Sequence, residues 1–263
     1  MKIAYICPYW DPAICGVKQT VKELAIRMHK KGHEVHVFTS DWDKEKRINK
    51  KEEIIEGIHI HRCVHILRVV NFVTIWPSVI PRLLKENFDI IHSHLSAHPH
   101  TFFAALVAKM KKIPHIHTTH CPWSDAERSI LGKLLLVPNY HTFNRWVFRN
   151  AHTIIAITPW EEQVIKKYGG KNIKVIRNGM SDLFFTKRKN LKFRKENNIS
   201  NKKILALFFG RLNPTKSPEF LAEVGREIGK ERKDIHFVFV GPDEGRREIV
   251  KEIIQGQEHM QLI

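Results

Sequence analysis

The sequence predicts an α/β protein in which parallel strands alternate with helices. Short apolar runs such as Lys2–Cys7 suit a buried strand and are too short for an ordinary helix. The segment Val17–Lys31 that follows is amphipathic, with its apolar residues on one helical face, and it ends at a glycine. A strand, a glycine-containing turn, this helix and a second strand, Glu34–Thr39, form a βαβ unit, whose strands are parallel.

The same alternation continues along the first part of the chain. Residues 41–57 are charged and are expected to form a solvated excursion. The apolar segment 64–88 has basic interruptions, and Pro77 and Pro81 are expected to bound its helical part. Residues 125–150 are expected to be helical with a break near Pro138. The other expected elements are strands at 58–63, 89–93, 115–119, 153–158 and 173–176, and helices at 101–112 and 159–168.

A polar and strongly basic stretch, 186–203, is expected to link a first domain at 1–185 to a second at 204–263. The second domain begins with an apolar strand at 204–209, and Ser217 is expected at the N-cap of the helix that follows. Further elements are a helix at 218–230, a strand at 236–240, a helix at 245–255 and the start of a strand at 260–263. Because a domain typically has ~100–150 residues, we expect this second one to be incomplete.

Composition narrows the classes of partner and compartment. Lys and Arg number 44 against 27 Asp and Glu, so the formal net charge is +17, which favours nucleic acid, anionic membranes or phosphorylated small molecules. Four cysteines without a C-x-x-C pair indicate reduced thiols in the cytoplasm. The N-terminus lacks a secretory pattern, and no apolar run reaches the ~18 residues of a membrane span. No basic helix interleaved with aromatics matches a known module, so we expect no nucleic-acid partner.

Two strand-to-helix turns are candidate phosphate sites. In the second domain Arg211 and Lys216 flank the turn, and the free N–H groups and dipole of a helix N-terminus favour anions. A forked guanidinium and a mobile ammonium suit a diphosphate, although both could be ordinary solvated cations of a basic protein. In the first domain Gly16 would let a ligand approach the backbone closely, at the turn where such folds bind phosphate or substrate.

Histidines gather around two of the predicted strands. They are His92 and His94, His98 and His100, and His115, His117 and His120, the last followed by Cys121. Zinc takes three or four such ligands. Alternate strand residues project in parallel, however, and no H-E-x-x-H or paired-cysteine motif fixes a geometry. We therefore expect no metal site.

Six segments, in this order and spacing, resemble glycosyltransferase family 4, whose members are retaining enzymes of the two-domain GT-B fold. They are 24–37, 89–94 (Asp-Ile-Ile-His-Ser-His), 113–120, 176–179 (Ile-Arg-Asn-Gly), 209–212 (Phe-Gly-Arg-Leu) with Lys216, and 240–242 (Val-Gly-Pro). The resemblance implies a Rossmann-like N-terminal domain on the acceptor side. It also implies that the incomplete second Rossmann-like domain binds a nucleotide sugar.

The resemblance assigns roles to residues of these segments. His120 would lie in the cleft between the domains, and Arg211 and Lys216 would stabilise the charge that develops on the β-phosphate of the donor; these three are the expected catalytic residues. The implied donor-binding residues are Gly16, Gly210, Arg211, Lys216, Gly241 and Pro242, and further cleft candidates are His94 and Asn178. No paired-Asp metal site is evident, and fixed cations can replace a metal, so no cofactor or metal is expected.

The chain departs from the family pattern at four places. Cys15 precedes Gly16 where paired glycines are usual, Thr158 replaces a serine and Ser217 replaces a glycine. The family's later motif, two glutamates separated by seven residues near a glycine- and proline-rich stretch, is absent. Pairs with that spacing, none followed by the expected sequence, are Glu45/Glu53, Glu219/Glu227, Glu223/Glu231 and Glu244/Glu252.

By this resemblance the function is transfer of a sugar from a nucleotide-diphosphate donor to an acceptor hydroxyl in glycan or glycolipid synthesis, with this chain an inactive fragment. The alternative is a non-catalytic binding or partner subunit that another polypeptide completes. Lipid-linked acceptors are common in the family, and two apolar segments edged by cations, 64–88 and 131–149, could contact an anionic membrane. The opposing interpretation is helices packed on their own sheet. We expect a cytoplasmic location, peripheral at the inner face of the cell membrane.

Overall fold

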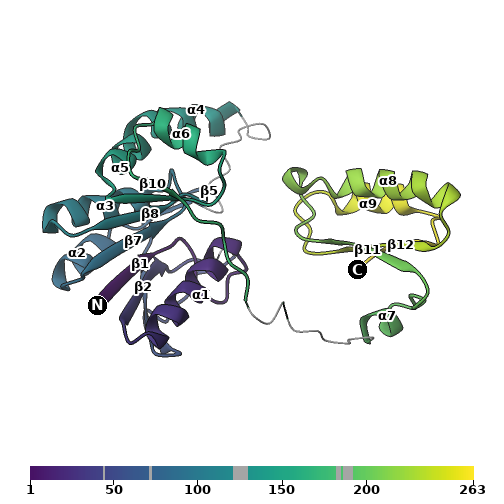
Figure 1. The fold of residues 1–263 in the computed structure, drawn as a ribbon, viewed down its shortest axis with the longest axis horizontal. Helices are drawn as coiled ribbons and strands as arrows, with labels where there is room; N and C mark the ends of the chain where they lie inside the picture. The colour runs from purple at the N-terminus through teal and green to yellow at the C-terminus, as the bar shows by residue number, and fades with distance from the viewer. Residues whose placement is uncertain (44, 71–72, 121–129, 182–184, 186–191) are drawn as a thin grey trace. The chain divides into compact units, whose positions relative to one another are not determined.

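The computed structural model describes residues 1–43, 45–70, 73–120, 130–181, 185 and 192–263. The chain divides into two compact units, Met1–Phe184 and Phe185–Ile263 (Figure 1). Each unit has its own parallel sheet and its own buried apolar core. The α/β fold class predicted from the sequence is therefore confirmed.

The sheet of the first unit contains eight described strands in the order β10-β9-β8-β7-β1-β2-β4-β3, and every neighbouring pair is parallel except β3 with β4. The strands are β1 Lys2–Ile6, β2 Glu34–Ser40, β3 Glu52–Ile55, β4 Ile58–Cys63, β7 Ile90–His94, β8 His115–Thr118, β9 Thr153–Ala156 and β10 Ile173–Val175. The order runs away from β1 in both directions, so a topological switch point lies between β1 and β7. In open α/β sheets, ligands bind beyond the carboxyl ends of the strands at such a point.

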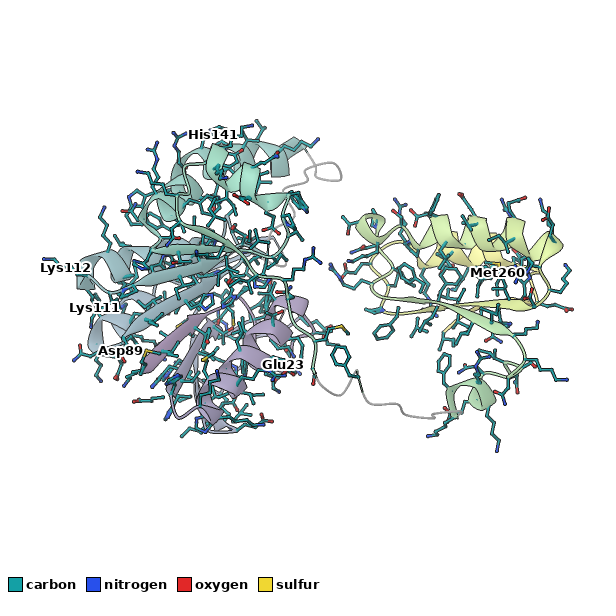
Figure 2. The ribbon with its side chains drawn as sticks, in the orientation of Figure 1. Glu23, Asp89, Lys111, Lys112, His141 and Met260 are labelled. Carbon is teal, nitrogen blue, oxygen red and sulfur yellow. The ribbon has the colours of Figure 1, made fainter. Side chains whose placement is uncertain are left out.

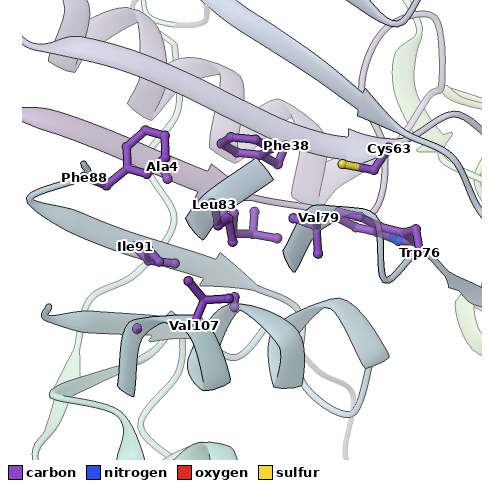
Figure 3. Packing of buried hydrophobic residues seen from close by; sticks show 12 residues of the cluster. Ala4, Phe38, Cys63, Trp76, Val79, Leu83, Phe88, Ile91 and Val107 are labelled. Carbon is purple, nitrogen blue, oxygen red and sulfur yellow. The ribbon is translucent and has the colours of Figure 1, made fainter. Parts of the chain in front are cut away.

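Helices cover both faces of this sheet. They are α1 Gly16–Lys30, α2 Val79–Lys85, α3 Pro99–Lys111, α4 Ile130–Asn139, the π-helix η1 Tyr140–Asn144, α5 Arg145–Asn150 and α6 Glu161–Lys167. On one face Val21 and Ala25 of α1 pack on the apolar side chains of β1, β2 and β4. On the other face, shown in Figure 3, Phe38 and Ile91 pack against Leu83 of α2 and Val107 of α3.

Two of the charged or apolar segments are more ordered than the sequence predicted. Residues 41–57, expected as a solvated excursion, contain β3, and Asp41 and Trp42 within them are buried. The segment 64–88 contains an antiparallel pair, β5 Leu67–Val70 with β6 Val73–Ile75, before α2. Pro81 does not bound α2 but lies in its first turn, where the missing N–H of a proline has no helical partner to lose.

The helical segment before β9 lacks the break that was expected near Pro138. Pro138 lies inside α4, and the helical path continues without a break through η1 into α5. The side-chain hydroxyl of Thr142 donates to the carbonyl of Pro138 itself at 2.7 Å. The π-helical turn is the local adjustment that accommodates the distortion. Residues 125–129 of the predicted helix lie outside the described residues.

The second unit has a three-stranded parallel sheet, β11-β12-β13, in its described part. Its elements are α7 Lys192–Glu196, β11 Ile204–Phe209, the 3-10 turn η3 Pro214–Lys216, α8 Pro218–Glu231, β12 Ile235–Val240, α9 Arg247–Ile254 and β13 Met260–Leu262. Figure 1 shows α8 and α9 on the same face of the sheet. Their core contains Ala222, Val250 and Met260, the last labelled in Figure 2. On the edge strand β11, alternation leaves Leu207 and Phe209 exposed.

Ser217 precedes α8 as predicted but does not cap it with its side chain. Its backbone is left-handed, with φ 45°, and its hydroxyl donates to the carbonyl of Pro214 at 3.0 Å. The 3-10 turn η3 therefore turns the hydroxyl of Ser217 back towards the preceding residues. The stretch 186–203, expected as a linker, contains α7, and Ile199 within it is buried. Within the part of the chain that the structure describes, no helix is long and apolar enough to cross a bilayer.

Candidate functional site

The carboxyl edge of the large sheet brings two of the predicted site histidines together. His94 is the last residue of β7, and His120 follows the end of the neighbouring strand β8. The Nδ1 atom of His94 lies 3.0 Å from the Nε2 atom of His120, and both side chains are buried. The ring of Tyr5, from β1, is centred 5.9 Å from that of His94. The pair therefore lies at the switch point, where the topology predicts a ligand site.

A hydrogen-bonded network of histidines and hydroxyls lies beneath this pair. The hydroxyl of Ser93 lies 2.8 Å from Nε2 of His115 and 2.9 Å from Nδ1 of His117. The hydroxyl of Ser96 lies 2.9 Å from the other nitrogen of His117. Nε2 of His100 donates to the backbone carbonyl of His94 at 2.9 Å, and Nε2 of His92 lies 2.8 Å from the hydroxyl of Thr118. The histidines thus act as hydrogen-bonding groups between the strands.

Burial keeps these histidines neutral at physiological pH. It lowers the pKa of His92 and His115 to about 3 and the pKa of His100 and His120 to about 4, because a charged imidazolium loses its hydration there. The same cause places the pKa of His94 and His117 well below its ordinary value. A neutral His120 can donate or accept a hydrogen bond, but it brings no positive charge to the site.

The backbone at His120 is held in a left-handed conformation, with φ 42°. The residue before it, Thr119, is fixed on three sides: its N–H donates to the carbonyl of Ile155 at 3.1 Å, its own carbonyl accepts from Ser96, and its hydroxyl donates to the buried carboxylate of Glu161. The second oxygen of Glu161 accepts from the hydroxyl of Thr158 at 2.9 Å. Glu161 therefore links α6 to the turn that positions His120.

Sequence reasoning missed Glu161, although a signal for it was present. Thr158 and Glu161 have the T-x-x-E spacing of a capping box, in which the glutamate is placed near the helix start. Here the N–H of Glu161 bonds the carbonyl of Thr158, and the carboxylate also reaches the neighbouring strand. The hydroxyl of Thr158, which departs from the family's serine, keeps this function.

The loop after β1 is tied to α1 by an ion-pair cluster. Asp11 accepts from the ammonium groups of Lys18 at 2.6 Å and Lys22 at 2.8 Å. Gly16 begins α1 after Cys15, and a Cβ atom placed on it would meet no atom within 4 Å. The space at Gly16 is open, as a ligand-approach site requires, but packing alone would admit a side chain there. Asn178 is exposed in the segment after β10.

In the second unit, the predicted cation turn forms a second constellation. Arg211 follows β11, and Lys216 ends η3; both side chains are exposed. One guanidinium nitrogen of Arg211, Nη1, donates to both carboxylate oxygens of Glu244, at 3.1 and 2.7 Å. The amide of Asn213 donates to the same carboxylate at 3.0 Å, and its oxygen accepts from the N–H of Lys216 at 3.1 Å. Sequence reasoning identified the two cations but neither Asn213 nor the role of Glu244.

The glycines of this turn have a packing reason. Gly241 has φ 153°, and a Cβ atom on it would lie 1.8 Å from the carbonyl oxygen of Gly210. The turns after β11 and β12 therefore approach each other as closely as two backbones can. The N–H of Leu212 donates to the carbonyl of Pro242 at 2.9 Å and completes the contact. Gly210, Gly241 and Pro242 thus lie beside Arg211 in one unit.

Within the described residues, no group of three or more His, Cys, Asp or Glu side chains is arranged to hold a metal ion. The histidine rings of the first unit hydrogen-bond to each other, to hydroxyls and to the backbone. Cys121, named beside them in the sequence, lies outside the described residues.

The parallel sheets and the switch-point site define this chain as a GT-B type α/β protein, the fold of similar solved glycosyltransferase structures. Residues 14–182 match the family model described as Glycosyltransferase Family 4. This match covers more than half of the chain, so the chain belongs to that family. The resemblance that the sequence motifs indicated is thereby confirmed.

The curated proteins that resemble this chain share only a modest sequence identity with it. The chain is 26% identical over 257 residues to an alpha-monoglucosyldiacylglycerol synthase of Acholeplasma laidlawii, covering 92% of this chain and 63% of that protein. It is 24% identical over 247 residues to the phosphatidylinositol N-acetylglucosaminyltransferase GPI3 subunit of Saccharomyces cerevisiae, covering 91% of this chain and 52% of that subunit. The chain therefore spans between half and two thirds of the length of these relatives.

Among solved structures, Anabaena Alr3699/HepE in complex with UDP-glucose aligns with a TM-score of 0.66 at 16% identity, over 100% of this chain and 68% of that one. At this identity the likeness establishes the fold alone.

Proposed function

We propose that this chain belongs to a retaining glycosyltransferase that moves a sugar from a nucleotide-diphosphate donor to an acceptor hydroxyl in glycan or glycolipid synthesis. The observation that carries the proposal is the family match over 14–182, together with the His94–His120 pair at the switch point of the matched sheet. The turn in the second unit carries two exposed cations, Arg211 and Lys216, whereas His120 of the first unit is neutral.

The chemical problem in such a transfer is the negative charge that accumulates on the β-phosphate as the sugar leaves. Arg211 and Lys216 would stabilise this charge without a metal, and preorganised groups of this kind each contribute about 3 kcal/mol to lowering a barrier. His120, neutral and fixed in orientation, would hydrogen-bond to the donor sugar or to the acceptor. Gly16, with open space at its α-carbon, would admit a phosphate or sugar close to the start of α1.

A uridine nucleotide is the donor class that we propose. The support is the alignment with Alr3699/HepE, whose structure contains UDP-glucose. The direct test is calorimetric titration of the chain with UDP. Substituting Arg211 or Lys216 by alanine should weaken binding about tenfold or more, since hydrogen bonds to charged groups contribute about 1.5–3 kcal/mol. Lys202→Ala, at an exposed lysine before β11, is the matched control and should leave binding unchanged.

The proposal includes the expectation that residues 1–263 alone bind nucleotide weakly and transfer no sugar. The expectation rests on the small second unit, whose three described strands leave Leu207 and Phe209 of β11 exposed. Incubation with radiolabelled UDP-sugars and lipid acceptors measures it. Transfer by the purified chain would contradict this part of the proposal while supporting the enzyme class.

A lipid-linked acceptor and contact with an anionic membrane surface are the second part of the proposal. Both curated relatives carry lipid names, diacylglycerol in one and phosphatidylinositol in the other. The helical segment 130–150 exposes Leu134, Val137 and Phe143, and Arg149 is exposed at its end. The exposed apolar surface of this segment is smaller than the sequence predicted, because Val147 and Phe148 are buried in the core.

In the other predicted segment, 64–88, the helix α2 buries Val79 and Leu83, while Ile66, Leu67 and Leu84 are exposed. Sedimentation with anionic vesicles tests the membrane contact. Phe143→Ser should reduce the bound fraction, and no sedimentation of the unsubstituted chain would refute the contact.

A partner subunit is the second candidate function. The specific observation in its favour is that one relative is named as the GPI3 subunit of a larger transferase. If the chain pairs with another polypeptide, size-exclusion chromatography of a complex isolated from its native host should recover it with that partner. Nucleotide binding that needs no partner favours the first candidate.

A further inference from the structure

The guanidinium of Arg211 is already engaged by an anionic group of the chain itself. Its Nη1 atom donates to both oxygens of Glu244, which lies in the loop between β12 and α9. A carboxylate and a phosphate present oxygen acceptors of the same kind to a guanidinium. Glu244 therefore engages an N–H donor of Arg211 that a phosphate oxygen could also use.

A buried amide fixes this carboxylate in place. Asn213 is only 7% exposed, and its Nδ2 donates to Glu244 at 3.0 Å. The oxygen of the same amide accepts from the N–H of Lys216 and from the hydroxyl of Thr215, at 3.1 and 3.0 Å. The guanidinium of Arg211, the carboxylate of Glu244 and the backbone N–H of Lys216 therefore belong to one hydrogen-bonded assembly, organised around Asn213.

We propose that Glu244 is an internal competitor for the diphosphate: it pairs with Arg211 and must yield that guanidinium when the ligand binds. The inference rests on the proposed function, in which Arg211 binds the donor's diphosphate. The side chains of Arg211 and Glu244 are 49% and 42% exposed, so water screens their attraction and the pair can open at modest cost. As the diphosphate product leaves, the carboxylate takes its place again.

Competition predicts the direction in which one substitution changes the dissociation constants of the ligands. Glu244→Gln removes the negative charge while keeping an oxygen that can accept from Asn213. The guanidinium is then no longer neutralised, and repulsion between the carboxylate and the phosphate is lost. We expect the Kd for UDP and the Kd for inorganic pyrophosphate each to fall about three- to fivefold, the size of one exposed ion pair. If Glu244 merely positioned Arg211, the same substitution would raise both constants.

Isothermal titration calorimetry of the 263-residue chain at fixed ionic strength measures both constants. Glu248→Gln is the matched control: it makes the same charge change four residues along, at an exposed glutamate that pairs with Lys251 at 2.6 Å. Its constants should equal those of the unsubstituted chain. In an Arg211→Ala background, Glu244→Gln should no longer improve binding, because the competed group is gone.

Each outcome either supports or overturns the competition between Glu244 and the diphosphate. Tighter binding by Glu244→Gln that disappears in the Arg211→Ala background supports competition. Unchanged or weaker binding overturns it, and so does an equal gain with and without Arg211, which would indicate a general effect of charge. If the unsubstituted chain and both glutamine variants bind neither UDP nor pyrophosphate, the proposed binding of the diphosphate at this turn is refuted. The proposed competition by Glu244 is then refuted as well.

Discussion

Mild acid should unfold the first unit, because its core contains neutral histidines. Burial lowers the pKa of His92 and His115 to about 3 and that of His100 and His120 to about 4. In an unfolded chain these side chains titrate near pH 6.5. Below pH 6.5 the unfolded chain therefore binds protons that the folded unit does not accept. Stability is lost as the pH falls from about 6.5 towards the folded-state values.

The magnitude follows from proton linkage. Between pH 7 and pH 5, a histidine whose pKa drops from 6.5 to 4 or below costs the folded state about 2 kcal/mol. The four histidines together cost about 7 kcal/mol, comparable with the whole stability of a typical domain, about 5–15 kcal/mol. Repulsion between neighbouring histidines acts in the same direction, since His115 and His120 also lower the pKa of His92. We expect the first unit to unfold near pH 5.

Urea denaturation followed by tryptophan fluorescence isolates this unit, because all six tryptophans precede residue 161. The decisive variant is His115→Gln, which removes one titrating group and can keep a polar contact to Ser93. Near pH 5 the four histidines should contribute about 5 kcal/mol per pH unit to the slope of unfolding free energy against pH, and His94 and His117 add to it in the same direction. The variant should lower the slope by about 1.3 kcal/mol per unit. The control is His141→Gln, at the exposed histidine labelled in Figure 2, which should leave the slope unchanged.

The reasoning would be refuted by a stability that is flat between pH 7 and pH 5. It would also be refuted if His115→Gln and the unsubstituted chain had the same slope, since the loss of stability would then come from other groups.

Two further substitutions test the packing around the sites. Gly241→Ala should destabilise the second unit by more than about 2 kcal/mol, since its Cβ atom would overlap the carbonyl of Gly210. Gly245→Ala, at a φ of 96° with open space, should cost only about 1–2 kcal/mol; amide hydrogen exchange of the second unit compares the two, and equal losses would contradict the steric argument. Glu161→Gln should cost the first unit about 1–3 kcal/mol, because an amide cannot accept from both buried hydroxyls through its two terminal atoms. Glu162→Gln, at an ion pair on the surface of α6, should cost less than about 0.5 kcal/mol by urea denaturation; a similar loss in both would disprove a special role for the buried carboxylate.

The order of strands and helices could be predicted because each element has its own local period. The elements that the sequence predicted poorly contain a charged residue or a proline whose cost is offset by its position in the fold. In β3, Glu53 pairs with Arg62 of the neighbouring strand, so a charged residue there does not indicate solvation. In α2, Pro81 lies in the first turn, where a proline disrupts no hydrogen bond. Such compensation depends on tertiary position and cannot be read from composition.

The sites were predictable to different extents. His94 and His120 could be placed together because parallel neighbouring strands end at the same edge. The partners of the cations could not, since Glu244 is 33 residues from Arg211 and only the folded turns bring them into contact. Glu244 and Glu252 are separated by seven residues without the sequence expected of the family's later motif, and this spacing gave no sign of the ion pair between Glu244 and Arg211.

The candidate site residues of the two units differ in charge. In the first unit, burial removes the positive charge from every histidine of the His94–His120 edge, which leaves hydrogen-bonding groups suited to sugar hydroxyls. In the second, Arg211 and Lys216 are exposed cations, and the carboxylate of Glu244 offsets one of them. Because a neutral imidazole cannot compensate a developing diphosphate charge, the proposed transfer assigns that stabilisation to Arg211 and Lys216. An activity that persisted after both cations were removed would place that stabilisation elsewhere.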